Sequence, residues 1–193
     1  MICKIKGSIN IFNCQISAGF RGCKDFPDCN GGPGCVAPKP CDRTVKFGDH
    51  REQSGTVGNS SICFSEGSAG HIENCEISDC GGGGILCQGD GSSLTVKSCR
   101  VSRNGMAGLE AREGGRLVAI DNDIYANRYH GILIGPFANE CKLVHNKIFE
   151  NNREGIIVIR TKDQVVVNSN RIYHNLAFGI SLESCQADQF KNF

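Results

Sequence analysis

A repeat of about 24 residues constrains the fold of this chain more than any other feature of its sequence. A Gly followed by Ile or Leu returns at steps of 24, 23, 24 and 24 residues, at positions 84, 108, 131, 155 and 179. Cys or Asn returns with the same period at positions 75, 99, 122, 146 and 170, and again at 80, 104, 127, 151 and 175. Three markers in phase over five units indicate that one small structural unit is stacked along an axis.

Within each unit the hydrophobic pattern alternates with a period of two, which is typical of β-strands. Ile132 and Ile134, for example, alternate with Leu133 and Gly135, and Gly or Asn corners bound each short segment. Segments this short are strands rather than helices. Strands of successive units can then pair about 4.8 Å apart. We therefore predict an all-β fold, a parallel β-helix with about 24 residues in each turn, or rung.

Two other repeat folds fit less well. Leucine-rich repeats share the period but require Leu at fixed positions, and propeller blades need about 40 residues per unit. The repeated asparagines suit β-helix corners, because Asn tolerates the left-handed backbone conformation and its amide can bond the Asn of the next rung. We predict that Asn146 is structural and bonds Asn122 and Asn170.

The sequence divides into three parts. Residues 1–19 hold a partial early rung, because residues 8–19 repeat the pattern of residues 68–79. Residues 20–60 form an irregular insertion that contains Cys, Gly and Pro, and residues 61–193 form the β-helix array. We expect the array to be truncated at its C-terminal end, because the sequence stops soon after the first strand of a new rung.

The thirteen cysteines are many for a chain of this length. Those at repeat positions are replaced by Asn, Leu or Val in other rungs, which favours buried, reduced thiols over a disulfide framework. The insertion contains four more at intervals of six residues, namely Cys23, Cys29, Cys35 and Cys41. Zinc binding, local disulfides and plain loop cysteines all remain open for these four, although zinc ligands usually lie closer together in the sequence.

Composition and charge exclude several classes of function. A net charge of +1 gives no electrostatic basis for binding nucleic acid or an anionic membrane. No apolar run approaches the roughly 20 residues of a membrane span, and the first ten residues lack the apolar segment of a secretory signal. Together with the reduced thiols, this predicts a cytoplasmic or nuclear protein. No cofactor is expected, because no Gly-rich phosphate loop opens a helix.

Leu133, Ile157 and Ile159 form the first candidate site. If Ile132, Ile134 and their equivalents point inward, these three side chains point outward on neighbouring rungs. A water-facing apolar patch often marks a contact with another protein, although another part of the chain can cover such a patch instead. We therefore expect a protein partner, with carbohydrate as the alternative ligand.

Asp121, Asp123 and His145 form a weaker candidate, a polar cluster on adjacent rungs. A His beside two carboxylates can act as a general base or help to bind a divalent ion, whereas a solvated surface ladder is the structural alternative. On the first-strand face, Glu110 and Glu183 lie three rungs apart, about 14 Å. Paired glycosidase carboxylates lie about 5–9.5 Å apart. We therefore expect no catalytic site on that face and favour a protein that is not an enzyme.

One further outward column contains aromatic residues, in the order Ser78, Ser102, Tyr125, Phe149 and Tyr173. Aromatic rings on successive rungs can stack and stabilise the rungs. We expect this structural role, with sugar or peptide binding as the alternative.

The rungs resemble a known family. Gly131-Ile-Leu-Ile and Gly155-Ile-Ile-Val are each followed by Asn-x-Ile-x-x-Asn, at 146–151 and 170–175. Over residues 62–185 this rhythm resembles the right-handed parallel β-helix repeat of pectin lyase-like proteins, which implies a right-handed helix. In residue content, the Cys- and Ser-rich rungs, such as residues 75–80, are most similar to the non-enzymatic β-helix F-box substrate receptors and related eukaryotic scaffold proteins.

This resemblance implies a non-catalytic protein–protein recognition or scaffold module, such as the substrate-recognition part of a ubiquitin-ligase receptor-like protein. The alternative is a carbohydrate-binding or polysaccharide-modifying β-helix protein, that is, a lyase, a hydrolase or an epimerase. Against a polygalacturonase, the sequence lacks the Gly-His-Gly motif of that group, and Arg171-Ile-Tyr replaces its Arg-Ile-Lys.

Overall fold

A computed structural model describes residues 3–5, 8–17, 60–185 and 190–192. The described residues form twenty β-strands in three parallel sheets. Sheet A contains β1 (Cys3–Ile5), β4 (Ile62–Phe64), β7 (Ile85–Gln88), β10 (Leu109–Arg112), β13 (Ile132–Ile134), β16 (Ile156–Ile159) and β19 (Ile180–Glu183). Sheet B contains β2 (Ser8–Phe12), β5 (Ala69–Glu73), β8 (Ser93–Lys97), β11 (Arg116–Ile120), β14 (Cys141–Val144), β17 (Val165–Asn168) and β20 (Phe190–Asn192). Sheet C contains β3 (Gln15–Ser17), β6 (Glu76–Ser78), β9 (Arg100–Ser102), β12 (Asp123–Tyr125), β15 (Lys147–Phe149) and β18 (Arg171–Tyr173).

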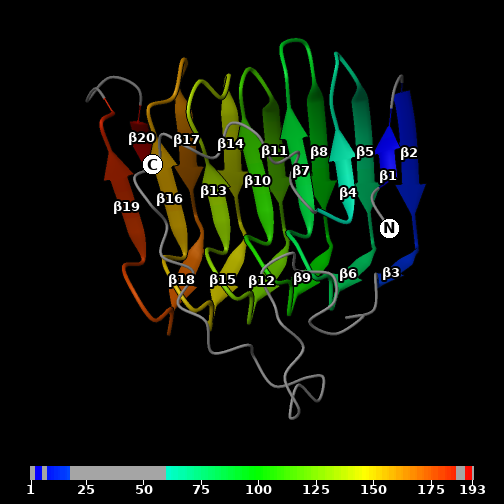
Figure 1. Ribbon diagram of the computed structural model, residues 1–193. Coiled ribbons are helices and arrows are strands. Elements are labelled where there is room, and N and C mark those ends of the chain that lie inside the picture. The colour runs from blue at the N-terminus through cyan, green and yellow to red at the C-terminus, as the bar shows by residue number, and fades with distance from the viewer. Residues whose placement is uncertain (1–2, 6–7, 18–59, 186–189, 193) are drawn as a thin grey trace, which may run out of the picture.

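The three sheets run side by side along one axis, and the chain visits them in the order A, B, C in every rung (Figure 1). Each strand pairs with the strand three places further along the chain, so that residues about 24 apart in sequence become neighbours. The colours of Figure 1 accordingly pass from one end of the helix to the other without mixing. The predicted parallel β-helix is confirmed. The described residues contain no helix that is long and apolar enough to cross a membrane.

The core is a column of apolar side chains that point into the helix from all three sheets. In sheet A the inward side chains include Ile132, Ile134 and Val158, as the alternation of the sequence predicts. Sheet B contributes side chains such as Leu117 and Leu143, which are fully or almost fully buried. The backbone pairs with the rungs on either side, so the interior between the corners can be apolar.

The repeated glycines stand where sheet C turns into sheet A. A Cβ atom on Gly131 would lie 2.4 Å from Ile148 Cγ2 and 2.7 Å from the Gly155 carbonyl oxygen. Both distances are far below a normal van der Waals contact, because the corner backbone packs directly against the core. The glycine marker of the repeat therefore reflects close packing.

The asparagines form two hydrogen-bonded ladders at the corners that flank sheet C. In the first ladder, Asn122 donates from its backbone N and from Nδ2 to Asn146 Oδ1, at 3.1 and 2.9 Å. Asn146 donates in the same way to Asn170 Oδ1, at 2.9 Å in both cases. The second ladder repeats this pattern from Asn104 to Asn175. The predicted bonds of Asn146 are confirmed.

Cysteines continue the first ladder toward the N-terminus. The backbone N of Cys75 donates to Cys99 Sγ at 3.4 Å, and the backbone N of Cys99 donates to Asn122 Oδ1 at 2.9 Å. Each sulfur therefore occupies the acceptor position of an asparagine amide, although sulfur is a weaker acceptor. All eight cysteines whose side chains the structure describes are free, which agrees with the predicted reduced thiols.

The irregular insertion at residues 20–60 and the C-terminal truncation of the array stay predictions. The insertion at 20–60, including Cys23, Cys29, Cys35 and Cys41, lies outside the described residues except for Ser60. Strands β1 to β3 pair with β4 to β6, so the early rung stacks directly on the array.

Candidate functional site

The predicted contact patch is only partly exposed. Leu133 and Ile157 point outward from sheet A in one column, but Ile159 belongs to the neighbouring column, in register with Glu183. Ile157 is 3% exposed, whereas Leu133 and Ile159 are half-buried. The inward and outward assignments were therefore right, and the expectation that all three face water was wrong for Ile157. Alternation specifies only the side of a strand on which a residue lies.

The predicted polar cluster does not assemble into one site. Asp121 and His145 occupy the same exposed corner position on successive rungs, with φ of 54° and 55°. The Asp123 carboxylate instead lies 3.5 Å from Lys147 Nζ on the next strand of sheet C. Among the described residues, no ion pair joins His145 to either aspartate. Nor does any group of three or more His, Cys, Asp or Glu in that part of the chain have the arrangement of a metal site.

The outer face of sheet C carries two regular columns. The first column contains charged residues in the order Glu76, Arg100, Asp123, Lys147 and Arg171. The sign of the charge alternates over the first four residues, and the fifth is basic like the fourth. In the second, the Phe149 ring stacks between Tyr125 and Tyr173, with centroids 4.9 and 5.1 Å apart and planes within 5° of parallel. Because the rings cover one another's faces, this column suits a structural role better than sugar stacking.

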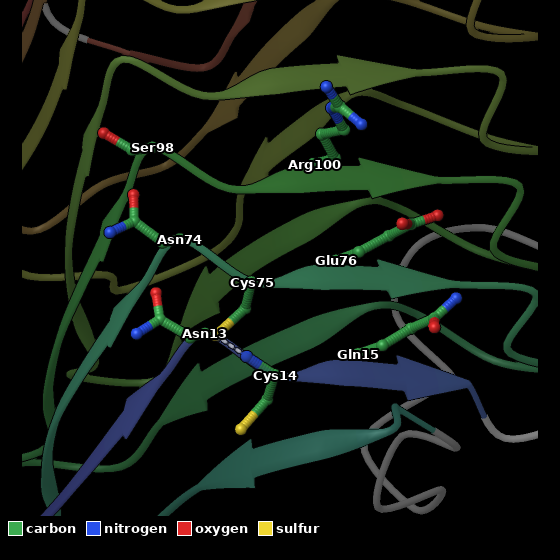
Figure 2. A pocket seen from close by; sticks show the side chains of 8 residues that line it. All are labelled: Asn13, Cys14, Gln15, Asn74, Cys75, Glu76, Ser98 and Arg100. Carbon is green, nitrogen blue, oxygen red and sulfur yellow. Dashed lines mark hydrogen bonds between the residues drawn. The ribbon is translucent and has the colours of Figure 1, made fainter.

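A surface depression lies where sheet B turns into sheet C at the N-terminal rungs. Figure 2 shows its lining as corner side chains, ladder cysteines and outward strand residues, namely Asn13, Asn74, Ser98, Cys14, Cys75, Gln15, Glu76 and Arg100. Cys75 Sγ accepts a hydrogen bond from the Cys14 backbone N at 3.4 Å (Figure 2). The Cys75 sulfur therefore acts as a hydrogen-bond acceptor in the first ladder.

A polar cluster interrupts the outward column of sheet A, which otherwise holds Cys63, Leu86, Leu133 and Ile157 between β4 and β16. Glu110 lies in this column, and its Oε1 is 3.4 Å from Arg112 Nη1. The Arg112 guanidinium donates to Gln88 Oε1 from Nε at 3.2 Å and from Nη2 at 3.1 Å. We call Glu110, Arg112 and Gln88 the sheet A polar cluster.

The environment of Glu110 perturbs its ionisation. Its side chain is 14% exposed and that of Arg112 is 19% exposed. Burial raises the pKa of Glu110, because the carboxylate loses hydration; the nearby Arg112 acts in the opposite direction and Glu113 adds to the rise. A largely buried carboxyl with a raised pKa beside a guanidinium is typical of a functional site.

This cluster was not predicted from the sequence. Glu110 was expected only as one half of a glycosidase pair with Glu183, and three rungs do separate these two residues. The available signal was a carboxylate in a column of apolar side chains, since burying a charge is costly unless it has a partner.

A second group of polar side chains lies at the corner that leads from sheet C into sheet A. His130 Nδ1 lies 2.8 Å from Glu154 Oε2, and both side chains are largely buried. In the neighbouring corner position, Arg153 Cζ lies 5.3 Å from the centroid of the Tyr129 ring. The corner and the sheet A polar cluster place ionisable groups on the three successive rungs of β10, β13 and β16.

Three of the buried thiols have raised pKa values. Burial raises the pKa of Cys87 and of Cys141 to about 12, and that of Cys99 to about 11. The thiolate is the reactive form of cysteine, so burial lowers the reactivity of these three side chains.

Comparisons with solved structures find the same fold in a carbohydrate-modifying enzyme. The periplasmic alginate epimerase AlgG matches with a TM-score of 0.60 and 18% identity, over 67% of this chain and 31% of that chain. A point mutant of the same epimerase matches with a TM-score of 0.55 and 19% identity, over 68% of this chain and 37% of that chain. This chain thus spans about a third of the length of these epimerases. At this identity the likeness concerns the fold.

These comparisons correct one expectation and leave another without support. The cytoplasmic or nuclear location inferred from the thiols is wrong by this comparison, because the structures with the same fold come from periplasmic proteins. The relation to F-box receptors has no support in the comparisons. A comparison with curated proteins finds no match.

A match to a protein-family model shows the family to which the chain belongs. Residues 45–180 match the model described as the right handed beta helix region. The predicted right-handed, pectin lyase-like β-helix is confirmed by this match together with the three parallel sheets. Since the matched segment covers well over half of the chain, the protein belongs to the right handed beta helix family.

Proposed function

We propose that this chain is part of a carbohydrate-active β-helix protein and that a polysaccharide binds along the outer face of sheet A. The observation that carries the proposal is the sheet A polar cluster, in which Glu110, within an apolar column, and Arg112 beside it are both largely buried. The fold shared with alginate epimerases supports a carbohydrate as the ligand. By the same reasoning, we propose a periplasmic or extracellular location.

The chemistry of the cluster suits a sugar. Arg112 offers several N–H donors and Gln88 an amide, and both kinds of group bond hydroxyl and carboxylate oxygens. Glu110 has a raised pKa, which brings it closer to the range in which a carboxyl can exchange protons with a substrate. The sheet repeats the same backbone every 4.8 Å or so, so that an extended polymer can contact several rungs at once.

A protein–protein recognition role is the second candidate. It depends on an apolar contact surface at Leu133, Ile157 and Ile159, and the burial of Ile157 removes the middle of that surface. The polar cluster lies next to Leu133 on the same face, so the two candidate functions compete for one surface.

Binding measurements on paired variants test the proposal. A panel of neutral and acidic oligosaccharides, including alginate fragments, is titrated calorimetrically into the wild-type chain and into Arg112→Ala. We expect at least one oligosaccharide to bind, and Arg112→Ala to weaken binding about tenfold or more, because a hydrogen bond to a charged group contributes about 1.5–3 kcal/mol.

Lys147→Ala is the matched control, since Lys147 is an exposed cation on the outer face of sheet C. It should leave the affinity unchanged. Thermal unfolding of each variant shows whether the fold is intact. Absence of binding to every oligosaccharide, or an equal loss in both variants, would contradict a carbohydrate site on sheet A.

A further inference from the structure

Three cysteines lie one above another at the corner where sheet B turns into sheet C. Cys14, Cys75 and Cys99 directly precede β3, β6 and β9, which pair in register, so these cysteines occupy equivalent positions on consecutive rungs. Rungs lie about 4.8 Å apart, and the Cα atoms of a disulfide lie roughly 4.4–6.8 Å apart. The backbone spacing between neighbouring members of this column therefore suits a disulfide.

The pair of Cys14 and Cys75 is the one that a reagent in solution can reach. Cys14 is exposed, and it lines the surface depression together with Cys75 (Figure 2). Cys99, by contrast, is 1% exposed, and burial raises its pKa to about 11. Because cysteine reacts through its thiolate and needs access to the reagent, Cys14 is the first of the three to react, with Cys75 beside it.

The Cys75 sulfur lies against the backbone of Cys14. Cys75 Sγ accepts a hydrogen bond from the Cys14 backbone N at 3.4 Å, so this sulfur is displaced toward the rung of Cys14. Cys14 Sγ donates to the Phe12 carbonyl at 3.2 Å, and a thiol is a weak donor. Rotation about the Cα–Cβ bond of Cys14 breaks this weak bond and frees the thiol to approach Cys75 Sγ.

We propose that Cys14 and Cys75 are a redox-active pair that closes to a disulfide by exchange with a small-molecule disulfide such as oxidised glutathione. The Cys14 thiolate attacks one glutathione sulfur, the S–S bond of glutathione breaks, and the released glutathione takes up the proton that Cys14 lost. The Cys75 thiolate then attacks the Cys14 sulfur of the mixed disulfide, and the second glutathione leaves with the proton from Cys75. Two protein thiols are oxidised to one disulfide, and one glutathione disulfide is reduced to two thiols.

The disulfide joins the first rung covalently to the array. Cys14 directly precedes β3 and Cys75 directly precedes β6, and these two strands are paired neighbours in sheet C. In the sequence the two cysteines are 61 residues apart. A link across so long a stretch of chain removes much of the conformational freedom of the opened chain. Separation of β2 and β3 from the array therefore becomes rarer in the oxidised protein.

Redox titration of the full chain tests the pair. Protein with reduced thiols is equilibrated in buffers of increasing ratio of oxidised to reduced glutathione, alkylated, and digested without reduction for mass spectrometry. We expect linked peptides that join Cys14 to Cys75, lighter by two hydrogen atoms than the separate peptides. Cys14→Ser and Cys75→Ser should each abolish this link. Cys99→Ser is the matched control and should leave the link in place, because Cys99 lies in the same column one rung beyond Cys75.

Hydrogen exchange supplies a second measurement. In the oxidised wild type, the amides of β2 and β3 should exchange about tenfold or more slowly than in the reduced protein. Cys14→Ser should show no such change in the same oxidising buffer. Unchanged exchange in the oxidised wild type overturns the joining of the first rung to the array. The redox pair is overturned if Cys14 stays reduced at every ratio, keeps glutathione while Cys75 remains reduced, or links to a different cysteine.

Discussion

Replacing Asn146 with Leu tests how much the buried asparagine ladder contributes to stability. Asn146 is fully buried. Its Oδ1 accepts from the backbone N and from Nδ2 of Asn122, at 3.1 and 2.9 Å. Its Nδ2 donates to the Ala119 carbonyl and to Asn170 Oδ1, at 2.9 Å in both cases. One side chain thus joins three rungs.

The expected loss is the difference between two opposing effects. Asn146→Leu removes the acceptor of two donors of Asn122 and the donor to the Ala119 carbonyl, and each buried group without a partner costs about 1–3 kcal/mol. Asn122 Nδ2 retains its bond to the Val96 carbonyl at 2.9 Å, so the lower part of that range applies to it. Burial of the apolar Leu side chain returns roughly 2 kcal/mol. We expect the free energy of unfolding to fall by about 1–3 kcal/mol.

The chain itself suggests the matched control, because Cys75 and Cys99 occupy the same ladder. A sulfur there accepts the backbone N–H of the preceding rung, as Cys99 does from Cys75 at 3.4 Å. Asn146→Cys should therefore destabilise the protein less than Asn146→Leu does, because a weak acceptor remains. Urea unfolding of both variants, followed by far-UV circular dichroism under reducing conditions, measures the difference. A Leu variant as stable as wild type, or a Cys variant that loses more than the Leu variant, would refute the hydrogen-bond explanation.

Three further predictions follow from burial and stacking. Ile157→Asp should lower the thermal unfolding temperature far more than Ile159→Asp, because only the first places a carboxylate at a buried position; equal shifts would show that both positions are open to water. Phe149→Ala should cost about twice as much stacking energy as Tyr173→Ala, because Phe149 stacks on both sides. Each ring pair contributes roughly 0.5–1.5 kcal/mol. Equal losses of stability in urea unfolding would contradict this. Among the cysteines described, exposed Cys14 should react with a thiol reagent well before the buried ones, as mass spectrometry of timed alkylation would show.

The features that the sequence predicted correctly all depend on the period of the repeat. Once residues 24 apart become neighbours, Asn122 and Asn146 must lie one above the other, and so must Tyr125 and Phe149. Alternation along each strand then assigns every side chain to the interior or the exterior. These relations need no knowledge of what else packs on the helix, so sequence alone was enough for the fold, the ladders and the stack.

The candidate sites depended on the tertiary structure, for a physical reason. Whether an outward side chain meets water is decided by the other groups that pack beside and over it, and periodicity does not encode these groups. Ile157 and Glu110 both point outward, yet one is buried and the other is largely removed from solvent. Desolvation, which raises the pKa of Glu110, is a property of that packing. The sequence by itself determined which residues share a column, and only the tertiary structure decided which column contains a carboxyl with altered chemistry.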